Sequence, residues 1–486
     1  MRIVLVSPEA VPFAKTGGLA DVAGALPGPL AELGHEVSVI MPLYRKVREA
    51  GFDPHDMGVK LSVPVGEKRV PGEVAKAELL GTDVPVYFIE CERFFDRPEL
   101  YGTSTGDYED NCERFVFFSR AVLQAADKLG LKPDVFHVND WQSALVPVYL
   151  STLYSGMESV AKARTLLTIH NLAYQGLFPH TLMPVTGLGW KYFNIDGLEY
   201  YGKIDLLKGG ILYSDKISTV SERYAQEIQT EEYGCGHEGI LAGRAKDLTG
   251  IVNGIDYAQW NPKTDELIFT NYSADDLSGK ATCKAELQKL CSLPQDPGIP
   301  VIGMVSRLAD QKGLDLLVKI MPKFMKMKVQ LVILGTGQKK YHEILEGVAR
   351  KYPEKTGIHV RFDNQLAHQI EAGSDIFLMP SRYEPCGLNQ LYSLAYGTVP
   401  LVRATGGLAD TITDTNDATV SAGTANGFSF EEYSGKALLA TIRRAVKAYH
   451  DETLWKIVTL NGMRQDWSWS ASAKKYSALY ESMAGM

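Results

Sequence analysis

Short runs rich in β-branched residues alternate with longer helix-like stretches along almost the whole chain. In the first half, the apolar runs span residues 3–7, 36–41, 84–90, 135–138, 166–170 and 216–220. This alternation is typical of βαβ units, in which helices connect the parallel strands of one sheet. The pattern therefore predicts an α/β chain with a doubly wound, Rossmann-like domain in its first half.

The alternation pauses between residues 255 and 299 and then restarts. The second set of apolar runs spans residues 301–305, 330–334, 359–362, 375–379 and 399–402. The chain has 486 residues, about twice the size at which one hydrophobic core stops growing. We therefore expect two Rossmann-like domains that face each other across a cleft, at residues 1–254 and 255–460. We expect the last stretch, about 461–486, to be helical and to pack back on the first domain.

Composition and charge exclude several classes of protein. Lys and Arg number 50 against 58 Asp and Glu, a formal charge of −8, so no overall positive field favours nucleic acid. No segment approaches the roughly 18 apolar residues of a membrane-spanning helix. The six cysteines form no CxxC pair and no compact Cys/His cluster, which argues against a zinc site or a disulfide framework. The N-terminal apolar run is too short for a signal peptide, so we expect a cytoplasmic protein.

One hexapeptide occurs twice, as Thr16–Asp21 and as Thr405–Asp410. Each copy follows an expected strand and opens a helical pattern, and the glycine pair lets backbone N–H groups approach a phosphate at a helix N-terminus. An equally simple interpretation is that both turns merely require glycine. Lys15 precedes the first copy, but the loop has neither the G-x-G-x-x-G spacing nor the G-K-[ST] ending, which argues against an oxidoreductase and a P-loop ATPase.

Charged residues follow two of the expected strands in the second half. Arg307 and Lys312 come after the run 301–305, where open α/β sheets bind ligands, and both cations suit a phosphate. Glu384 lies in the segment 380–392, between the run 375–379 and a helix-like stretch. It could hold a sugar hydroxyl or offset positive charge at an anomeric carbon. The simpler alternatives are solvated surface cations and an ordinary helix-start acid.

Polar and aromatic residues also gather after two neighbouring strands of the first half. Asp140 and Trp141 follow the run 135–138, His170 ends the run 166–170, and Tyr174 follows that run. Hydrogen-bonding groups beside an aromatic face are the composition of a sugar-binding site. A lone histidine at a strand end is more often structural, so the gathering carries more weight than any one member.

Taken together, these motifs resemble the bacterial glycogen synthases and plant starch synthases over essentially the whole chain. The matching segments are 15–21, 137–141, 168–176, 252–256, 306–307 with 312–313, 384–388 and 405–410. The resemblance implies a GT-B architecture and a retaining glucosyltransferase that extends an α-1,4-glucan from a sugar nucleotide. Resemblance to this branch favours ADP-glucose as the donor, although no residue pattern distinguishes it from UDP-glucose.

The resemblance also implies roles for individual residues. The catalytic set would be Glu384, His170, Asp140, Arg307 and Lys312. Acceptor-binding residues would be Asp140, Trp141 and Tyr174. Donor-binding residues would be Lys15, Gly17, Gly18, Asp21, Asn253, Arg307, Lys312, Phe362, Cys386, Gly387, Leu388, Thr405, Gly406 and Gly407, with Phe362 stacking on the base.

The wider set of retaining transferases carries a second carboxylate eight residues after the first, whereas this chain has Tyr392. We therefore expect Glu384 to be the one functional carboxylate of its motif. The expected loops contain no Asp-x-Asp segment and two cations can neutralise a diphosphate, so no metal and no cofactor is expected. The partners would be the nucleotide sugar and a glycogen acceptor, with no nucleic acid and no membrane, and the oligomeric state is left open.

Two other functions remain open at this point. A glucan phosphorylase would resemble this architecture, but it would bring a pyridoxal phosphate lysine and a much longer chain. A catalytically silent glucan-binding protein would keep the fold and lose the chemistry. Lys15, Arg307, Lys312 and Glu384 are all present, which favours an enzyme.

Overall fold

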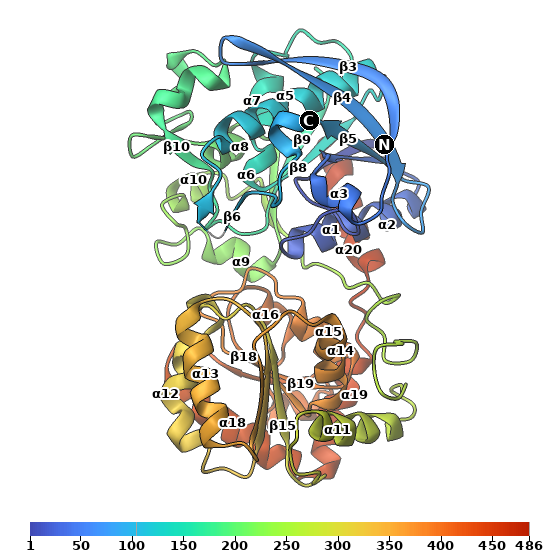
Figure 1. The fold of residues 1–486 in the computed structure, drawn as a ribbon, viewed down its shortest axis with the longest axis vertical. Helices are drawn as coiled ribbons and strands as arrows, with labels where there is room; N and C mark the ends of the chain where they lie inside the picture. The colour runs from blue at the N-terminus through green and yellow to red at the C-terminus, as the bar shows by residue number, and fades with distance from the viewer. Residues whose placement is uncertain (104, 486) are drawn as a thin grey trace. The chain divides into compact units, whose positions relative to one another are not determined.

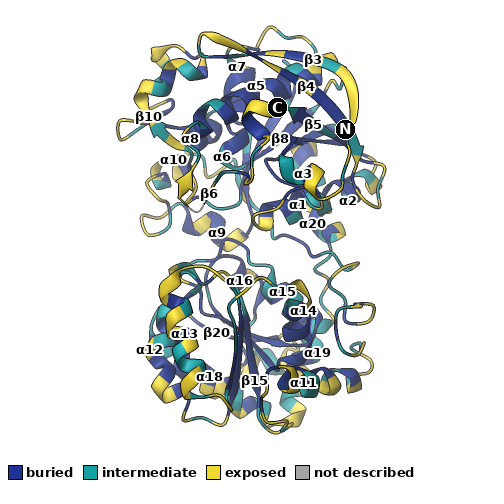
Figure 2. Cartoon of the chain, viewed as in Figure 1, coloured by how far each residue is buried: buried dark blue, intermediate teal, exposed yellow. Residues whose placement is uncertain are grey.

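The computed structural model describes residues 1–103 and 105–485 and divides into two compact units. One unit comprises Met1–Gly254 with Trp469–Met486, and the other comprises Ile255–Ser468. Each unit has its own sheet, covered by helices on both faces, and its own hydrophobic core (Figure 1). The central strands of both sheets are almost wholly buried, whereas the strands His55–Val65 and Lys68–Glu78 and the outer faces of the helices carry exposed residues (Figure 2).

The first unit is built on a nine-stranded sheet in the order β14-β13-β9-β8-β1-β2-β5-β4-β3. The strands are β1 (Arg2–Val6), β2 (Glu36–Pro42), β3 (His55–Val65), β4 (Lys68–Glu78), β5 (Pro85–Glu90), β8 (Val135–Asn139), β9 (Arg164–Ile169), β13 (Lys216–Thr219) and β14 (Leu248–Gly250). All neighbours pair in parallel except β3 with β4 and β4 with β5. The carboxyl ends of β1, β8 and β9 therefore lie next to one another at one edge of the sheet.

Helices and smaller strands complete the first unit. The helices are α1 (Gly18–Ala25), α2 (Pro27–Glu32), α3 (Arg45–Glu49), α4 (Glu92–Phe95), α5 (Asn111–Lys128), α6 (Asp140–Ser143), α7 (Leu145–Ser151), α8 (Leu206–Tyr213), α9 (Glu222–Glu227), α10 (Glu238–Gly243) and α20 (Trp469–Met483), with 3₁₀ turns at His180–Thr186 and Trp190–Tyr192. The smaller strands are β6 (Gly102–Thr103), β7 (Gly106–Asp107), β10 (Leu177–Pro179), β11 (Glu199–Tyr200) and β12 (Lys203–Asp205). The hydrophobic contacts of α5 are extensive, since fourteen of its eighteen residues are buried.

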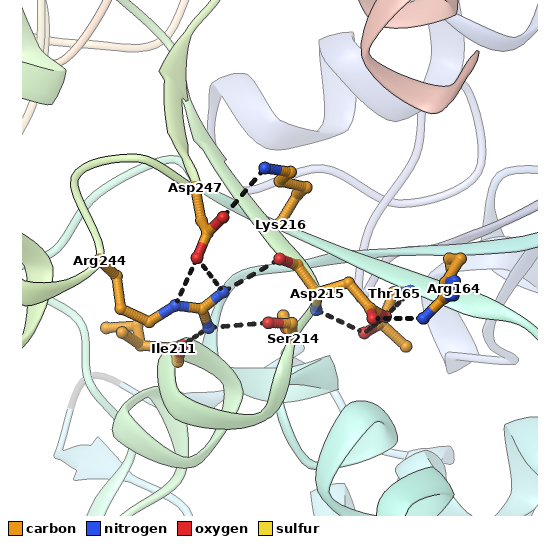
Figure 3. Close-up of polar contacts among 8 residues, drawn as sticks. All are labelled: Arg164, Thr165, Ile211, Ser214, Asp215, Lys216, Arg244 and Asp247. Carbon is orange, nitrogen blue, oxygen red and sulfur yellow. Dashed lines mark hydrogen bonds and ion pairs between the residues drawn. The ribbon is translucent and has the colours of Figure 1, made fainter. Parts of the chain in front are cut away.

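The opposite edge of this sheet, at the amino ends of β9, β13 and β14, is closed by an ionic network (Figure 3). The guanidinium of Arg244 donates to the carbonyl oxygens of Ile211 and Ser214, at 2.6 and 2.7 Å, and to the Asp247 carboxylate at 3.0 Å. The Asp215 carboxylate accepts from the Thr165 N–H at 2.8 Å. These contacts satisfy the polar groups that strand ends would otherwise leave unpaired, so this edge has a structural role.

The C-terminal helix α20 packs within the first unit. Tyr480 is fully buried, and its hydroxyl lies 2.8 Å from Nδ1 of His137, which is also buried, in β8. Ser472 donates to the carbonyl oxygen of Val252 at 2.8 Å, and Ser477 lies 2.8 Å from Nε2 of His35. The last helix thereby adds its aromatic face to a core formed by the first half of the chain.

The second unit has a six-stranded, wholly parallel sheet in the order β17-β16-β15-β18-β19-β20. The strands are β15 (Val301–Val305), β16 (Gln330–Leu334), β17 (Thr356–His359), β18 (Ile376–Met379), β19 (Val399–Arg403) and β20 (Phe428–Phe430). This is the Rossmann order 3-2-1-4-5-6, and the strand order reverses between β15 and β18. Ligands of such sheets bind at that point, outside the carboxyl ends of the strands.

The helices of the second unit are α11 (Ser278–Leu290), α12 (Leu314–Phe324), α13 (Lys339–Lys351), α14 (Asn364–Gly373), α15 (Asn389–Ala395), α16 (Gly406–Thr411), α17 (Asp417–Ser421), α18 (Gly435–Tyr449) and α19 (Glu452–Met463), with a 3₁₀ turn, η3, at Asp310–Lys312. The expected strand at 359–362 is wrong by three residues, because β17 ends at His359. Asp363 instead accepts the Leu366 N–H and caps α14, and this places Phe362 in a loop. Among the described residues, no helix is long and apolar enough to cross a membrane.

Candidate active site

In the second unit, the residues expected in the site come from the loops after β15, β18 and β19. Lys312 ends η3 after β15, Glu384 lies between β18 and α15, and Gly406 opens α16 after β19. Because β15, β18 and β19 are neighbours in the sheet, their carboxyl ends bring these three loops together. The loops meet at the point where the strand order reverses.

An ion pair joins two of these loops. Lys312 Nζ lies 2.6 Å from Glu384 Oε2, and the two side chains are 19% and 8% exposed. Ser381 donates its hydroxyl to the same oxygen at 3.0 Å. Both of these contacts are made to Oε2 of Glu384.

Two glycines allow the loops to approach one another closely. Gly313 has φ +73°, and a Cβ there would lie 1.9 Å from the carbonyl oxygen of Pro380. Gly406 has φ +44°, and a Cβ there would lie 2.0 Å from the carbonyl oxygen of Glu384. The Gly407 N–H donates to that same oxygen at 3.2 Å. The second copy of the hexapeptide therefore supports the backbone of Glu384, a use of glycine that the sequence did not indicate.

The remaining expected residues of this unit differ in exposure. Arg307 is exposed just after β15, and its Nη2 lies 3.5 Å from Oε1 of Gln311. Phe362 is 88% exposed in the loop after β17, two strands away from β15. Buried or half-buried around Glu384 are Cys386, Gly387, Leu388 and Thr405. The stacking of Phe362 on a base stays a prediction.

In the first unit, the expected residues come from the loops after β1, β8 and β9. Lys15 Nζ pairs with Asp21 at 2.7 Å, within the loop that leads from β1 into α1 and the start of that helix. Asp140 follows β8 and accepts the backbone N–H of His170 at 2.7 Å. The adjacent ends of β8 and β9 therefore place Asp140 beside His170.

The hydrogen bonds around His170 define its tautomer. Asn139 Nδ2 donates to the carbonyl oxygen of Val6 at 3.1 Å, so its Oδ1 faces Nε2 of His170, at 2.9 Å. Burial lowers the pKa of His170 to about 3, so the ring is neutral near pH 7. Nε2 then carries the proton and Nδ1 keeps a lone pair, which can accept a hydrogen bond from a sugar hydroxyl.

Asp140 has an unusual backbone and an unusual acidity. Its φ is +54°, in the left-handed region that side chains rarely adopt and that is often found at functional sites. Burial raises the pKa of Asp140 to about 7, the N–H of His170 opposes this shift, and the charge of Glu9 adds to it. Asp140 can therefore change protonation state close to neutral pH.

Three further expected residues differ in their surroundings. Trp141 is half-buried, with Phe115 packed edge-on at 4.8 Å, so its ring is largely part of the core. Tyr174 is 53% exposed and offers a free aromatic surface. Asn253 is 5% exposed, and its buried Oδ1 has no hydrogen-bond partner in the part of the chain that the structure describes. Buried polar atoms are normally paired, so Asn253 has the property of a ligand contact.

Two residues that hold parts of the site in place, Ser381 and Glu9, were not predicted from the sequence. Ser381 holds Glu384, and Glu9 accepts hydrogen bonds from the loop that contains Lys15 and Gly17. Glu9 follows the first strand, as the other site residues follow theirs, and that position was the available signal. Residues 1–103 and 105–485 contain no group of three or more His, Cys, Asp or Glu side chains that could hold a metal ion.

Two Rossmann-like units, each with the expected site residues at the carboxyl ends of its strands, are the architecture of the GT-B class of glycosyltransferases. Residues 2–243 match the family described as the starch synthase catalytic domain, and residues 292–456 match the glycosyl transferases group 1. The chain belongs to the glycogen synthase and starch synthase family, and it is a glycosyltransferase of glycogen synthesis.

Full-length similarity supports this assignment. The glycogen synthase of Koribacter versatilis is 48% identical over 481 residues, which cover 99% of this chain and 98% of that protein. The glycogen synthase of Thermosipho melanesiensis is 47% identical, with the same coverage. The catalytic domain of starch synthase IV from Arabidopsis thaliana, bound to ADP and acarbose, is 32% identical with a TM-score of 0.90, covering 100% of this chain and 99% of that one.

A more distant structure supports the fold alone. Sucrose-phosphate synthase from Thermosynechococcus elongatus is 17% identical, with a TM-score of 0.60, and covers 99% of this chain and 98% of that one. The two solved structures and the family models confirm the expected GT-B fold class. The full-length relatives and the family models confirm the expected glycosyltransferase activity.

Proposed function

We propose that this chain transfers glucose from ADP-glucose to the non-reducing end of an α-1,4-glucan, with retention of configuration, in the cytoplasm. The observation that carries the proposal is the Lys312–Glu384 pair at the point where the strand order of the second unit reverses. A cation for a diphosphate and a carboxylate for a sugar lie side by side there. The related starch synthase IV structure, with ADP and acarbose, supports the same pair of ligands.

The leaving group is stabilised by cations of the second unit. Arg307 and Lys312 hold the diphosphate, because an exposed guanidinium and an ammonium after β15 can neutralise its charge without a metal or a cofactor. Lys312 must exchange its present partner, Glu384, for the phosphate. Glu384, with Oε2 still held by the Ser381 hydroxyl, then turns its negative charge to the transferred glucose and its developing positive charge.

The reaction proceeds on one face of the sugar. The bond from C1 to the phosphate oxygen breaks, the bond from C1 to O4 of the acceptor forms, and the O4 proton passes to the departing phosphate oxygen. Neutral His170 accepts a hydrogen bond from a glucose hydroxyl through Nδ1, and Asp140 lies beside it. Tyr174 contacts the acceptor through its exposed ring.

A transfer assay with glycogen and either nucleotide sugar tests the proposal. We expect kcat/KM for ADP-glucose to exceed that for UDP-glucose by at least tenfold, and the added glucose to be released by an α-1,4-specific amylase. A preference for UDP-glucose would overturn the donor assignment, and product that resists the α-specific enzyme would overturn retention. Glu384→Gln is the control, because it keeps the size of the side chain and removes its charge.

A further inference from the structure

Glu9 is a buried carboxylate that lies directly under the loop containing Lys15. It is 4% exposed and follows β1. Its Oε2 accepts the backbone N–H groups of Thr16 and Gly17, the latter at 3.2 Å. Its Oε1 accepts the Thr16 hydroxyl at 2.8 Å and the Tyr101 hydroxyl at 2.9 Å. Both oxygens are therefore fully engaged, and three of the four donors belong to two consecutive loop residues.

No cation neutralises this carboxylate within the described part of the chain, since Lys15 pairs with Asp21 instead. Burial raises the pKa of Glu9, and the hydrogen bonds from Thr16, Tyr101 and Gly17 oppose that shift. A buried carboxylate without a counter-ion is costly, and an apolar side chain would fill the same volume without that cost. The carboxylate offsets this cost by holding the backbone of Thr16 and Gly17 in a defined conformation through its hydrogen bonds.

The second hydroxyl donor to Glu9 is itself held in place by α5. Asn111 donates to the carbonyl oxygen of Tyr101 at 2.9 Å, and Arg114 donates to that of Leu100 at 2.9 Å. Arg114 is completely buried and also donates to Asn111 at 2.7 Å. A continuous set of hydrogen bonds thus runs from the core helix through Tyr101 to Glu9 and on to the loop.

The carboxylate also selects which amides remain for a ligand. The N–H groups of Thr16 and Gly17 are used by Glu9, whereas Gly18, the first residue of α1, has no acceptor for its N–H among the described residues. Lys15 and Gly18 stand on either side of the two residues that are held. Fixing Thr16 and Gly17 therefore fixes the direction of both neighbours.

We propose that Glu9 is a positioning residue for the transfer reaction, which holds the loop so that Lys15 and the Gly18 amide meet the donor diphosphate. The inference rests on the proposed function and on the donor-binding roles that the family resemblance implies for Lys15 and Gly18. It assigns no contact between Glu9 and the substrate. The effect of Glu9 on the reaction passes through the shape of the loop.

Two substitutions of Glu9 distinguish the effect of the loop's conformation from the effect of the carboxylate's charge. In Glu9→Gln the amide oxygen can accept both backbone N–H groups, and the amide nitrogen faces the hydroxyls of Thr16 and Tyr101, which can rotate to accept. Glu9→Leu removes all four hydrogen bonds. At pH 8 we expect KM for the nucleotide sugar to rise at least tenfold in Glu9→Leu and to stay within threefold in Glu9→Gln, with KM for glycogen unchanged in both.

Thermal unfolding of Glu9→Leu shows whether the variant is folded, and a milder variant provides a test if it is not. If Glu9→Leu does not fold, Tyr101→Phe removes one donor only and should raise the donor KM by about two- to fivefold at an unchanged KM for glycogen. A folded Glu9→Leu with the wild-type donor KM would overturn the proposal. Equal damage in Glu9→Gln and Glu9→Leu would overturn it as well, because charge and not loop shape would then be the cause.

Combination with Lys15→Met distinguishes this inference from the proposed function. We expect Lys15→Met to raise the donor KM, and Glu9→Leu to add little in the double variant, because both changes remove the same contact. A wild-type donor KM in Lys15→Met would contradict the donor-binding role of Lys15. Fully additive effects would leave that role intact and contradict positioning by Glu9.

Discussion

Lys312 and Glu384 form an ion pair, with 2.6 Å between Nζ and Oε2, although they lie in loops that follow two different strands. The sequence suggested separate roles, a cation for the diphosphate and a carboxylate for the sugar. In the structure the two roles are coupled, because removal of Lys312 leaves the buried Glu384 carboxylate without its cation, and removal of the Glu384 charge frees the half-buried Lys312. Ser381, on the same oxygen, limits how far Glu384 can move.

The first prediction concerns this pair. Glu384→Gln should lower kcat by about 10²-fold or more, by analogy with loss of one preorganised stabilising group. Affinity for ADP should not fall, because Lys312 loses its internal partner and is free to bind phosphate. Lys312→Ala should weaken both ADP binding and turnover. Steady-state kinetics and calorimetric titration with ADP measure the two effects.

The coupling gives this prediction a second test. The double variant Lys312→Ala with Glu384→Gln should lose less activity than the sum of the two single losses in free energy, because each single change already breaks the pair. Lys340→Ala is the control, since Lys340 pairs with Asp310 at 2.6 Å on the exposed side of the same loop. Near-normal kcat in a folded Glu384→Gln would show that Glu384 is only a helix-start acid.

The second prediction is that His170 stays neutral from pH 5 to pH 8. Burial lowers its pKa to about 3, and the hydrogen bond to Asn139 selects the tautomer protonated at Nε2. Nitrogen chemical shifts of labelled histidine, assigned by comparison with His170→Gln, report both properties. A titration of His170 near its ordinary pKa of about 6.5 would contradict the assignment of Nδ1 as an acceptor.

The third prediction concerns pH and Asp140. Burial raises the pKa of its carboxyl to about 7, above the ordinary value, so the folded protein holds this proton more tightly than the unfolded chain does. Between the unfolded and folded pKa values, stability therefore falls as pH rises. Asp140→Asn should raise the unfolding temperature at pH 8 relative to the wild type, and by less at pH 5. An equal change at both pH values would contradict a raised pKa.

The fourth prediction is that turnover needs no metal ion. Arg307 and Lys312 supply two positive charges for the diphosphate, which is the task that Mg²⁺ performs in many nucleotide-dependent enzymes. Activity with ADP-glucose should therefore be unchanged in an excess of chelator after dialysis. Activity that is abolished by the chelator and restored by Mg²⁺ would contradict the expectation.

Strand positions could be predicted from the sequence because a buried parallel strand is a short apolar run, as at Val301–Val305. The hairpin of β3 and β4 was missed, although Leu61, Val63 and Val65 alternate with exposed or half-exposed residues in the manner of a half-buried strand. The search for apolar runs could not find a strand whose other face is exposed.

In the candidate site, likewise, some residues could be predicted from the sequence, whereas their contacts could not. Glu384 and Lys312 could be chosen because each follows an apolar run, but their contact depends on β15 and β18 being neighbours, which local pattern does not encode. Glu9 shares with the other site residues its position after a strand, but its contact with Tyr101 could not be predicted, because the two residues are 92 positions apart and become neighbours only through the fold. Long-range hydrogen bonds are the part of the site that the sequence leaves undetermined.

The last prediction tests the attachment of α20 to the first unit. Tyr480→Phe keeps the buried ring and removes the hydroxyl 2.8 Å from Nδ1 of His137, which leaves a buried ring nitrogen without its partner. The expected cost is about 1–3 kcal/mol in the free energy of unfolding. Thr168 still holds Nε2 of His137, so kcat should stay near the wild-type value.

Ser477→Ala is the matched control for Tyr480→Phe, because the Ser477 hydroxyl bonds the less buried His35 and its loss should cost less free energy of unfolding. Unchanged unfolding in Tyr480→Phe would mean that water or a rearranged side chain replaces the hydroxyl, and that this contact does not hold the helix in place.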